Sequence, residues 1–362
     1  MRVSTGQHLL IIRFSSFGDI VQSIGVPKAF RNKFSNAKVD WLTREDFSEL
    51  LTRHPEIHHV ISFSRKKGFI ELIRLAIELS TAHYTHIYDA HNNLRSHILV
   101  SVLKFCYLIR HLESAIKKNS DWRSPLFIRR PKNRIKRLLY FKFRLPTLPR
   151  HYRGANSFHE PLVPWGLEPI VPSGRQLFVD PSLPHSVENL LSSESKPIVA
   201  FAPSAAWAMK RWPVSHWQEL VRLLPEFSIF LLGGPEDDFL KEIAAIAPER
   251  VRNLAGQLTF NESCAFVARV PLLVANDTGL LHVADQMETP VIGLIGPTAF
   301  GYPTHATSLF LETPLYCQPC SKDGRGRCRN NIYQKCLVDI LPKKVAKKIK
   351  LILLPISPES NS

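Results

Sequence analysis

One stretch of this sequence, residues 271–285, reads PLLVANDTGLLHVAD and indicates the fold of the chain. An apolar run predicts a buried strand that ends in the polar residues N-D-T-G, and an amphipathic segment with His282 then predicts a helix. The free N–H groups at the start of a helix attract phosphate, so this junction predicts an anion site. The alternative is that Asp277 or Thr278 only caps the helix.

The same alternation recurs along the chain. In the first half, apolar runs predict strands at LLIIRF, KVDWLT, HVISF, THIYDA and FCYLI. In the second half, they do so at PIVAFAP, FSIFLLGG, PLLVAND and PVIGLIG. Strands that are apolar throughout and alternate with amphipathic helices predict parallel sheets covered on both faces. We therefore expect an α/β protein with two doubly wound, Rossmann-like domains that face each other across a cleft.

A Ser- and Pro-rich stretch, DPSLPHSVENLLSSESKP, separates the two series and places a domain boundary near residue 182. The expected domains are residues 1–182 and 183–340, followed by a basic helix and tail at 341–362.

No apolar run approaches the roughly 18 residues that a membrane span needs. The apolar block near the start is too short for a signal peptide. We therefore expect a cytoplasmic protein.

Two further loops follow predicted strands in the second half. APSAAWAMKRWP brings Ser204 and Lys210 to a strand end, where both side chains can reach a diphosphate. LLGGPEDD supplies three acids that can bind ribose hydroxyls, Glu236, Asp237 and Asp238. Acids are also common in a first helical turn without any ligand, but three such loops together predict a pocket for a nucleotide diphosphate. A dinucleotide fingerprint and a Walker A loop are both missing from the sequence, which disfavours an NAD-dependent oxidoreductase and an NTPase.

A lone carboxylate, Asp19, lies in the loop RFSSFGDIVQS after the first predicted strand. It is conspicuous because the chain carries a formal net charge of +16. A carboxylate at this edge suits a general base that takes a proton from an acceptor hydroxyl, while the other domain holds an activated donor.

These motifs resemble the heptosyltransferases of lipopolysaccharide core synthesis, glycosyltransferase family 9, which have the two-domain GT-B fold. The resemblance covers roughly residues 8–340. It rests on the S-x-G-D of residues 16–19, on DAHNNLRS, on KRWP from Lys210, and on NDTGLLHVAD followed by TPVIGLIGPT. It implies that the first domain binds the acceptor and that the second binds the nucleotide sugar.

The resemblance also implies an inverting transfer that requires no metal or other cofactor. Asp19 matches the family's proposed catalytic base, and the residues on the acceptor side are Ser16, Gly18 and Arg95. The residues implied to hold the donor are Ser204, Lys210, Asp237, Asp277, Thr278, Gly279 and His282.

The implied donor is ADP-heptose, and the implied acceptor is an acidic lipopolysaccharide inner core. Two departures from the family pattern leave the acceptor's identity open. His91 and Asn92 stand where the family usually has Gln and Gly, and Gly25 stands where it usually has proline.

Positive charge is concentrated in residues 117–153, which hold thirteen Lys or Arg and one acid, Asp121. This segment therefore supplies +12 of the net charge. Such a segment suits nucleic acid, an anionic membrane surface or a phosphorylated substrate. Given the resemblance, we expect the acidic acceptor or the cytoplasmic face of the inner membrane, and no nucleic acid. The lysine-rich tail either lies on an anionic surface or packs its apolar stripe, with Val345 and Ile349, onto the domains.

The sequence contains six cysteines, and four of them form a cluster near the end of the chain: Cys317, Cys320, Cys328 and Cys336. Disulfides are disfavoured in the cytosol, so this cluster suggests a structural zinc ion. Its x7 spacings are looser than standard zinc patterns, and many members of the family have cysteines here with no known ligand. Cys106 and Cys264 lie in apolar or helical contexts and are expected to be core residues.

The leading hypothesis is thus a heptosyltransferase that uses Asp19 as its base. One alternative is a family member with another nucleotide sugar or acceptor. The other is a non-catalytic protein of the same fold that binds nucleic acid or an anionic surface. The joint presence of Asp19, Lys210 and D-T-G-x-x-H disfavours a pure binding module.

Overall fold

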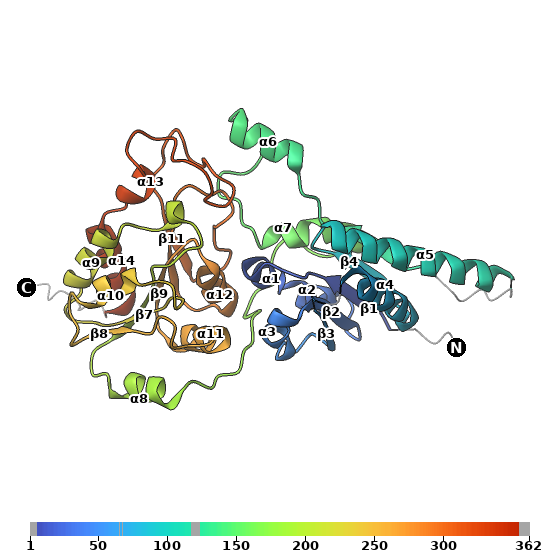
Figure 1. Ribbon diagram of the computed structural model, residues 1–362, viewed down its shortest axis with the longest axis horizontal. Helices are drawn as coiled ribbons and strands as arrows, with labels where there is room; N and C mark the ends of the chain where they lie inside the picture. The colour runs from blue at the N-terminus through green and yellow to red at the C-terminus, as the bar shows by residue number, and fades with distance from the viewer. Residues whose placement is uncertain (1–5, 65, 67, 117–123, 355–362) are drawn as a thin grey trace, which may run out of the picture. The chain divides into compact units, whose positions relative to one another are not determined.

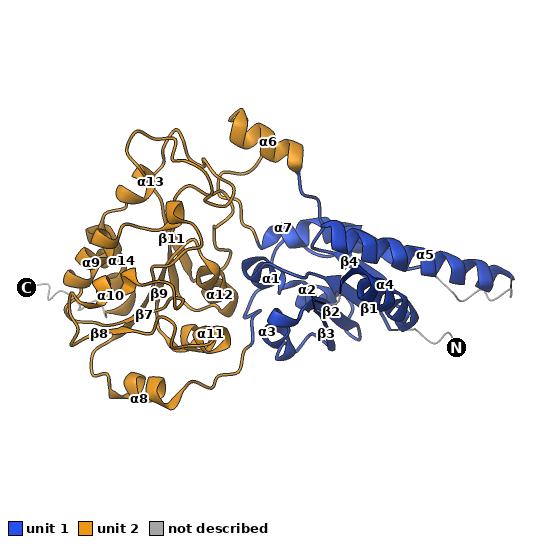
Figure 2. Cartoon of the chain, viewed as in Figure 1, with its two compact units in different colours: residues 1–133, 155–178 blue, residues 134–154, 179–362 orange. Residues whose placement is uncertain are grey.

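The computed structural model describes residues 6–64, 66, 68–116 and 124–354. The chain divides into two compact units, each with its own parallel sheet (Figure 2). Unit 1 comprises residues 1–133 and 155–178, and unit 2 comprises residues 134–154 and 179–362. Residues 134–154 thus group with the second unit, although the sequence placed them in the first domain. The domain boundaries near residues 182 and 340 stay predictions.

Unit 1 contains a five-stranded sheet in the order β3-β2-β1-β4-β5, in which every neighbouring pair is parallel (Figure 1). Leu9, Leu10 and Ile11 of the central strand are fully buried, as expected for a sheet covered on both faces. Its strands are β1 (His8–Ile12), β2 (Lys38–Arg44), β3 (His59–Phe63), β4 (His86–Asp89) and β5 (Leu126–Arg129). Its α-helices are α1 (Phe17–Ser23), α2 (Val26–Lys33), α3 (Glu49–Thr52), α4 (Gly68–Leu79), α5 (Leu94–Ile116) and α7 (Asn156–His159).

Unit 2 contains a six-stranded parallel sheet in the order β11-β10-β9-β6-β7-β8. Trp212, Trp217 and Phe227 are buried in its core. Its strands are β6 (Ile198–Ala202), β7 (Ser228–Leu231), β8 (Val251–Asn253), β9 (Leu273–Asn276), β10 (Val291–Leu294) and β11 (Ser308–Leu311). Its α-helices are α6 (Arg134–Lys142), α8 (His185–Ser193), α9 (Val214–Arg222), α10 (Phe239–Ala244), α11 (Phe260–Arg269), α12 (Gly279–Met287), α13 (Lys335–Val338) and α14 (Pro342–Leu353).

Both sheets reverse their strand order at one point, and ligands of doubly wound sheets bind outside the strand ends at such a point. In unit 1 the reversal lies between β1 and β4, and in unit 2 it lies between β9 and β6. Most residues predicted to bind ligand lie in or just after the loops that leave β1, β6 and β9, whereas Asp237 follows β7 and Arg95 follows β4. The predicted α/β class with two parallel-sheet domains is confirmed.

One predicted strand is wrong. FCYLI, residues 105–109, lies inside the 23-residue helix α5. A short apolar run does not distinguish a strand from a helix that is apolar on several sides. Here Leu103 and Tyr107 are buried at helical spacing, while Phe105 and Leu108 are exposed.

The C-terminal helix α14 packs against unit 2. Val345 and Ile349 are fully buried in the core of that unit, so the packing alternative for the apolar stripe is confirmed. Within the described residues, none of the helices has the length and apolar character needed to cross a membrane.

Candidate active site

A buried ion pair lies where β6 and β9 end in unit 2. Lys210 Nζ is 3.0 Å from Asp277 Oδ2, and the two side chains are only 14% and 7% exposed. Thr298 donates a hydrogen bond to the same carboxylate, and His282 Nε2 lies 3.9 Å from its other oxygen. Burial raises the pKa of Asp277, but Lys210 and His282 outweigh it and hold the pKa below its usual value. The carboxylate is therefore ionised and holds the lysine ammonium in place.

The side chain of Asn276 ties these two strand ends together. Its Nδ2 donates to the carbonyl of Pro203, and its Oδ1 accepts the N–H of Trp212. Trp212 is buried and donates its indole N–H to the carbonyls of Leu337 and Ile340. The loop that carries Lys210 is thus fixed against the end of β9.

The N-terminus of α12 is open to a ligand. Thr278 is the N-cap residue, but no side chain caps the helix, and its first turn contains no acid. Asp277 instead pairs with Lys210 and Thr298. The alternative that one of these side chains only caps the helix is therefore not supported, and the N–H groups from Gly279 onward are available to an anion.

A second sign of a ligand is the hydroxyl of Ser204. Its Oγ is buried and has no hydrogen-bond partner among the described residues. A Cβ added at Gly233 would lie 3.0 Å from this oxygen and 3.1 Å from Asp237 Oδ2, so the three residues adjoin. Buried hydroxyls are normally paired, which suggests that a bound ligand supplies the partner.

Of the three acids proposed for ribose, Asp237 is the one beside this hydroxyl. It accepts the N–H of Gly234, and Arg211 lies 3.8 Å away. Asp238 is exposed and pairs with Lys241. The ribose role of Asp237 stays a prediction.

Two features of this site were missed in the sequence. Gly301 is required because a Cβ there would lie 2.4 Å from Asp277 Cγ, so the backbone closes directly against the carboxylate. Thr298 belongs to the motif TPVIGLIGPT, but the motif did not reveal its bond to Asp277. The position of Gly301 soon after that motif is the feature of the sequence that could have pointed to its role.

A glycine-containing loop, residues 321–327, packs against Lys210. Gly324 has a φ of +89°, and a Cβ there would lie 2.5 Å from Lys210 Cγ. The next residue, Arg325, places its guanidinium 4.6 Å from the ring centre of Trp207. The loop therefore restricts the conformations of the lysine, and no pattern in the sequence predicted this contact.

In unit 1, Asp19 lies in the first turn of α1, just after β1. Arg13 Nη2 is 2.5 Å from Asp19 Oδ2, and Ser16 donates its hydroxyl to the same oxygen at 2.8 Å. Burial raises the pKa of Asp19, but Arg13, the Ser16 hydroxyl and Arg130 together lower it. The carboxylate remains 39% exposed. It is therefore ionised, oriented and accessible, and its pairing with Arg13 was not predicted.

The predicted acceptor residue Arg95 lies in a small pocket after β4. Phe14, Ser15, Arg44, Phe63, His91 and Asn93 line the same pocket. Burial and then Arg13 lower the pKa of His91 to about 4, so its imidazole is neutral at pH 7. Gly18 lies between Ser16 and Asp19 at the start of α1. The acceptor roles of Ser16, Gly18 and Arg95 stay predictions.

The structure gives the four-cysteine cluster no metal-binding geometry, and its zinc site stays a prediction. All six cysteines are free, and no group of three or more His, Cys, Asp or Glu side chains in the described chain is placed to hold a metal ion. Of the two expected core residues, Cys264 is fully buried and Cys106 is partly exposed.

Two units, each built on a doubly wound parallel sheet, have the architecture of the GT-B fold. The model of glycosyltransferase family 9 (heptosyltransferase) matches residues 175–325, so the chain carries a domain of that family.

Similarity extends well beyond that domain. The chain is 25% identical to lipooligosaccharide heptosyltransferase 2 of Haemophilus ducreyi, over 95% of this chain and 99% of the relative. It is 25% identical to lipopolysaccharide heptosyltransferase 2 of Escherichia coli, over 96% and 98%. The structure of E. coli ADP-heptose lps heptosyltransferase II matches with a TM-score of 0.68 at 20% identity, over 96% of this chain and 99% of that chain. The predicted resemblance and the GT-B fold are confirmed, and the chain groups with glycosyltransferases.

Proposed function

We propose that this protein transfers a heptose from ADP-heptose to an acidic acceptor of the lipopolysaccharide inner core. The observation that carries the proposal is the buried Lys210–Asp277 pair beside the uncapped N-terminus of α12. An ammonium and free helix N–H groups are the partners that a departing diphosphate needs, because its negative charge grows in the transition state.

On the donor side, Asp277 positions Lys210, and the unpartnered hydroxyl of Ser204 adjoins Gly233 and Asp237. Lys210 and the N–H groups from Gly279 onward bind the diphosphate, and Asp237 accepts ribose hydroxyls. His282, held near Asp277, completes the phosphate side of the pocket.

On the acceptor side, Asp19 removes the proton from the acceptor hydroxyl as its oxygen attacks the anomeric carbon. One displacement of this kind inverts the anomeric configuration, and no step requires a metal. Ser16 and Arg13 hold the carboxylate in a single orientation. Arg95 binds an acidic group of the acceptor.

Two alternative functions make different demands on this site. A relative that uses another nucleotide sugar or acceptor would share the diphosphate site but bind a different base or sugar. A non-catalytic protein that binds nucleic acid or an anionic surface would have no use for an unpartnered Ser204 beside a buried Lys210–Asp277 pair.

Thermal unfolding with ADP, UDP, GDP, NAD and ADP-heptose separates these candidates. A ligand at about 100 times its Kd adds roughly 2.7 kcal/mol to the free energy of unfolding. We expect stabilisation by ADP and ADP-heptose alone. Stabilisation by UDP or GDP would contradict the heptose donor, and a folded protein that responds to no nucleotide would overturn the proposal.

A further inference from the structure

Most arginines of the basic segment have structural partners. Arg129 Nε lies 2.7 Å from Asp89, and Arg130 stacks over the ring of Phe158 at 3.8 Å. Arg144 donates to the carbonyl of Cys317. Further along the segment, Arg150 pairs with Glu312 and Arg153 donates to the carbonyl of Thr304. Residues 117–123 lie outside the described residues. The cations left for an external partner are therefore few.

Those cations are concentrated on α6. Arg134, Lys136 and Lys142 are exposed, and among the described residues no carboxylate lies within ion-pair distance of them. The nine residues of α6 contain no acid at all. This helix thus carries uncompensated positive charge.

The same helix exposes large apolar side chains. Ile135 is 75% exposed and Leu138 is 54% exposed, and helical geometry places them on one face with Lys142. Phe143, just after the helix, is 56% exposed. A short helix with apolar side chains flanked by cations is typical of a segment that lies in the interface of an anionic membrane.

Other side chains of α6, which belongs to unit 2 (Figure 2), contact loops of that unit. The Phe141 ring lies 6.0 Å from that of Phe300, and the Arg137 guanidinium lies 4.7 Å from the centre of the Phe300 ring. Arg329 donates to the carbonyl of Phe141. Phe300 immediately precedes Gly301, whose backbone closes against Asp277. The helix is therefore held by the loops that border the donor site.

We propose that the exposed side chains of α6, which are Arg134, Ile135, Lys136, Leu138 and Lys142, dock on an anionic lipid surface. The occupant follows from charge complementarity: acidic headgroups satisfy the cations, and the acyl region receives Ile135 and Leu138. The inference deepens the proposed function, because it gives the route by which the protein reaches an acceptor embedded in a membrane.

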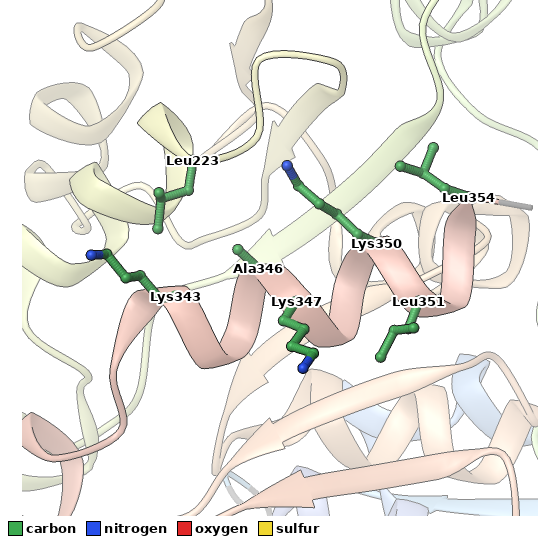
Figure 3. Close-up of a pocket in the computed structure, with 7 residues that line it drawn as sticks. All are labelled: Leu223, Lys343, Ala346, Lys347, Lys350, Leu351 and Leu354. Carbon is green, nitrogen blue, oxygen red and sulfur yellow. The ribbon is translucent and has the colours of Figure 1, made fainter. Parts of the chain in front are cut away.

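A rival basic surface lies on α14. A groove of about 530 Å³ runs along this helix, with Leu223 and Ala346 on its apolar side and Lys343, Lys347 and Lys350 among its lining residues (Figure 3). However, Lys350 already pairs with Glu226, and Val345 and Ile349 are buried in the core. This helix exposes Lys343, Lys344, Lys347 and Lys348 and is therefore the surface that a test must separate from α6. Its central apolar residues, Val345 and Ile349, are buried in unit 2, whereas Ile135 and Leu138 of α6 are exposed.

Co-sedimentation with phosphatidylglycerol-containing vesicles tests the inference, with pure phosphatidylcholine vesicles as the neutral reference. No nucleotide, acceptor or transfer step enters this assay, so it can fail independently of the proposed function. We expect the full chain to bind the anionic vesicles alone. Arg134→Glu/Lys136→Glu should weaken binding at least 25-fold, since each cation contributes roughly a five-fold change in affinity. Ile135→Ser/Leu138→Ser should weaken vesicle binding but leave the salt dependence of that binding unchanged.

The matched control is Lys343→Glu/Lys347→Glu on α14, which makes the same change in net charge. It should retain vesicle binding. No residue of α6 is buried, so both α6 variants should keep the parent's unfolding temperature, which verifies that they fold. Equal losses from the α6 and α14 charge variants would show that net charge alone drives binding and would overturn the assignment to α6. Binding to nucleic acid but not to anionic vesicles would overturn it as well.

Discussion

Removing the ammonium of Lys210 should cost both stability and donor affinity. In Lys210→Met, the buried carboxylate of Asp277 keeps only the Thr298 hydroxyl and the more distant His282. Removing one partner of a buried ion pair costs about 3–5 kcal/mol. The two surviving partners place the expected loss near the lower end, about 3 kcal/mol. For a unit of this size that corresponds to about 6–12 °C in the unfolding temperature.

The double variant Lys210→Met/Asp277→Asn separates the two roles of the pair. A neutral amide no longer needs a cation, and it can still accept the hydrogen bond of Thr298. Most of the lost stability should therefore return. Donor affinity should not return, because a hydrogen bond to a charged group contributes about 1.5–3 kcal/mol, or roughly ten- to a hundredfold in the Kd of ADP.

Urea unfolding and calorimetric titration with ADP measure the two quantities on the same preparations. If the single variant were as stable as the parent, the pair would not stabilise the fold. If the double variant bound ADP as tightly as the parent, Lys210 would not hold the diphosphate.

Three further variants test other parts of the account. Ser204→Ala should weaken ADP binding without lowering the free energy of unfolding, because its hydroxyl has no partner to lose; calorimetry and urea unfolding would show whether the two effects separate. Gly301→Ala should push against Asp277 and cost about 1–3 kcal/mol, whereas Gly234→Ala, whose added Cβ meets only an ordinary contact at 3.5 Å, should change stability little. The third variant concerns acid stability. Burial lowers the pKa of His159 to about 3 in the fold, so its contribution is complete above the unfolded value of 6.5 and is lost as the pH falls toward 3. His159→Leu should remove about 1.4 kcal/mol per pH unit from the slope of unfolding free energy in that range, and an unchanged slope would contradict the neutral histidine.

The sequence predicted the parts of the site that follow strand ends directly. The apolar run before N-D-T-G is short and is followed at once by turn residues and an amphipathic segment, which favours a buried strand, so the position of Asp277 at the end of β9 could be inferred. The same holds for Lys210 after β6 and Asp19 after β1. In each case the chemistry-bearing residue lies within a few residues of an unambiguous element.

The missed features depend on contacts between loops that are distant in the sequence. The approach of Gly324 to Lys210 and of Gly301 to Asp277 is a backbone approach, and a glycine alone does not reveal its neighbour. The pairing of Arg13 with Asp19 was missed for another reason, since it depends on the turn between β1 and α1. The basic segment illustrates the same limit: its charge was evident, but only the structure separates the arginines with internal partners from the exposed cations of α6.

The most direct test of the central claim is a transfer assay with ADP-heptose and a heptose-deficient lipopolysaccharide acceptor, followed by mass spectrometry of the acceptor. The parent protein should add one heptose to the acceptor. Asp19→Asn should bind ADP with unchanged affinity and transfer about 10²–10⁴ times more slowly, the range typical of a lost general base. Transfer by Asp19→Asn at the parent rate would contradict the role of Asp19, and a parent protein that binds ADP-heptose but never transfers its sugar to such an acceptor would contradict the proposed reaction.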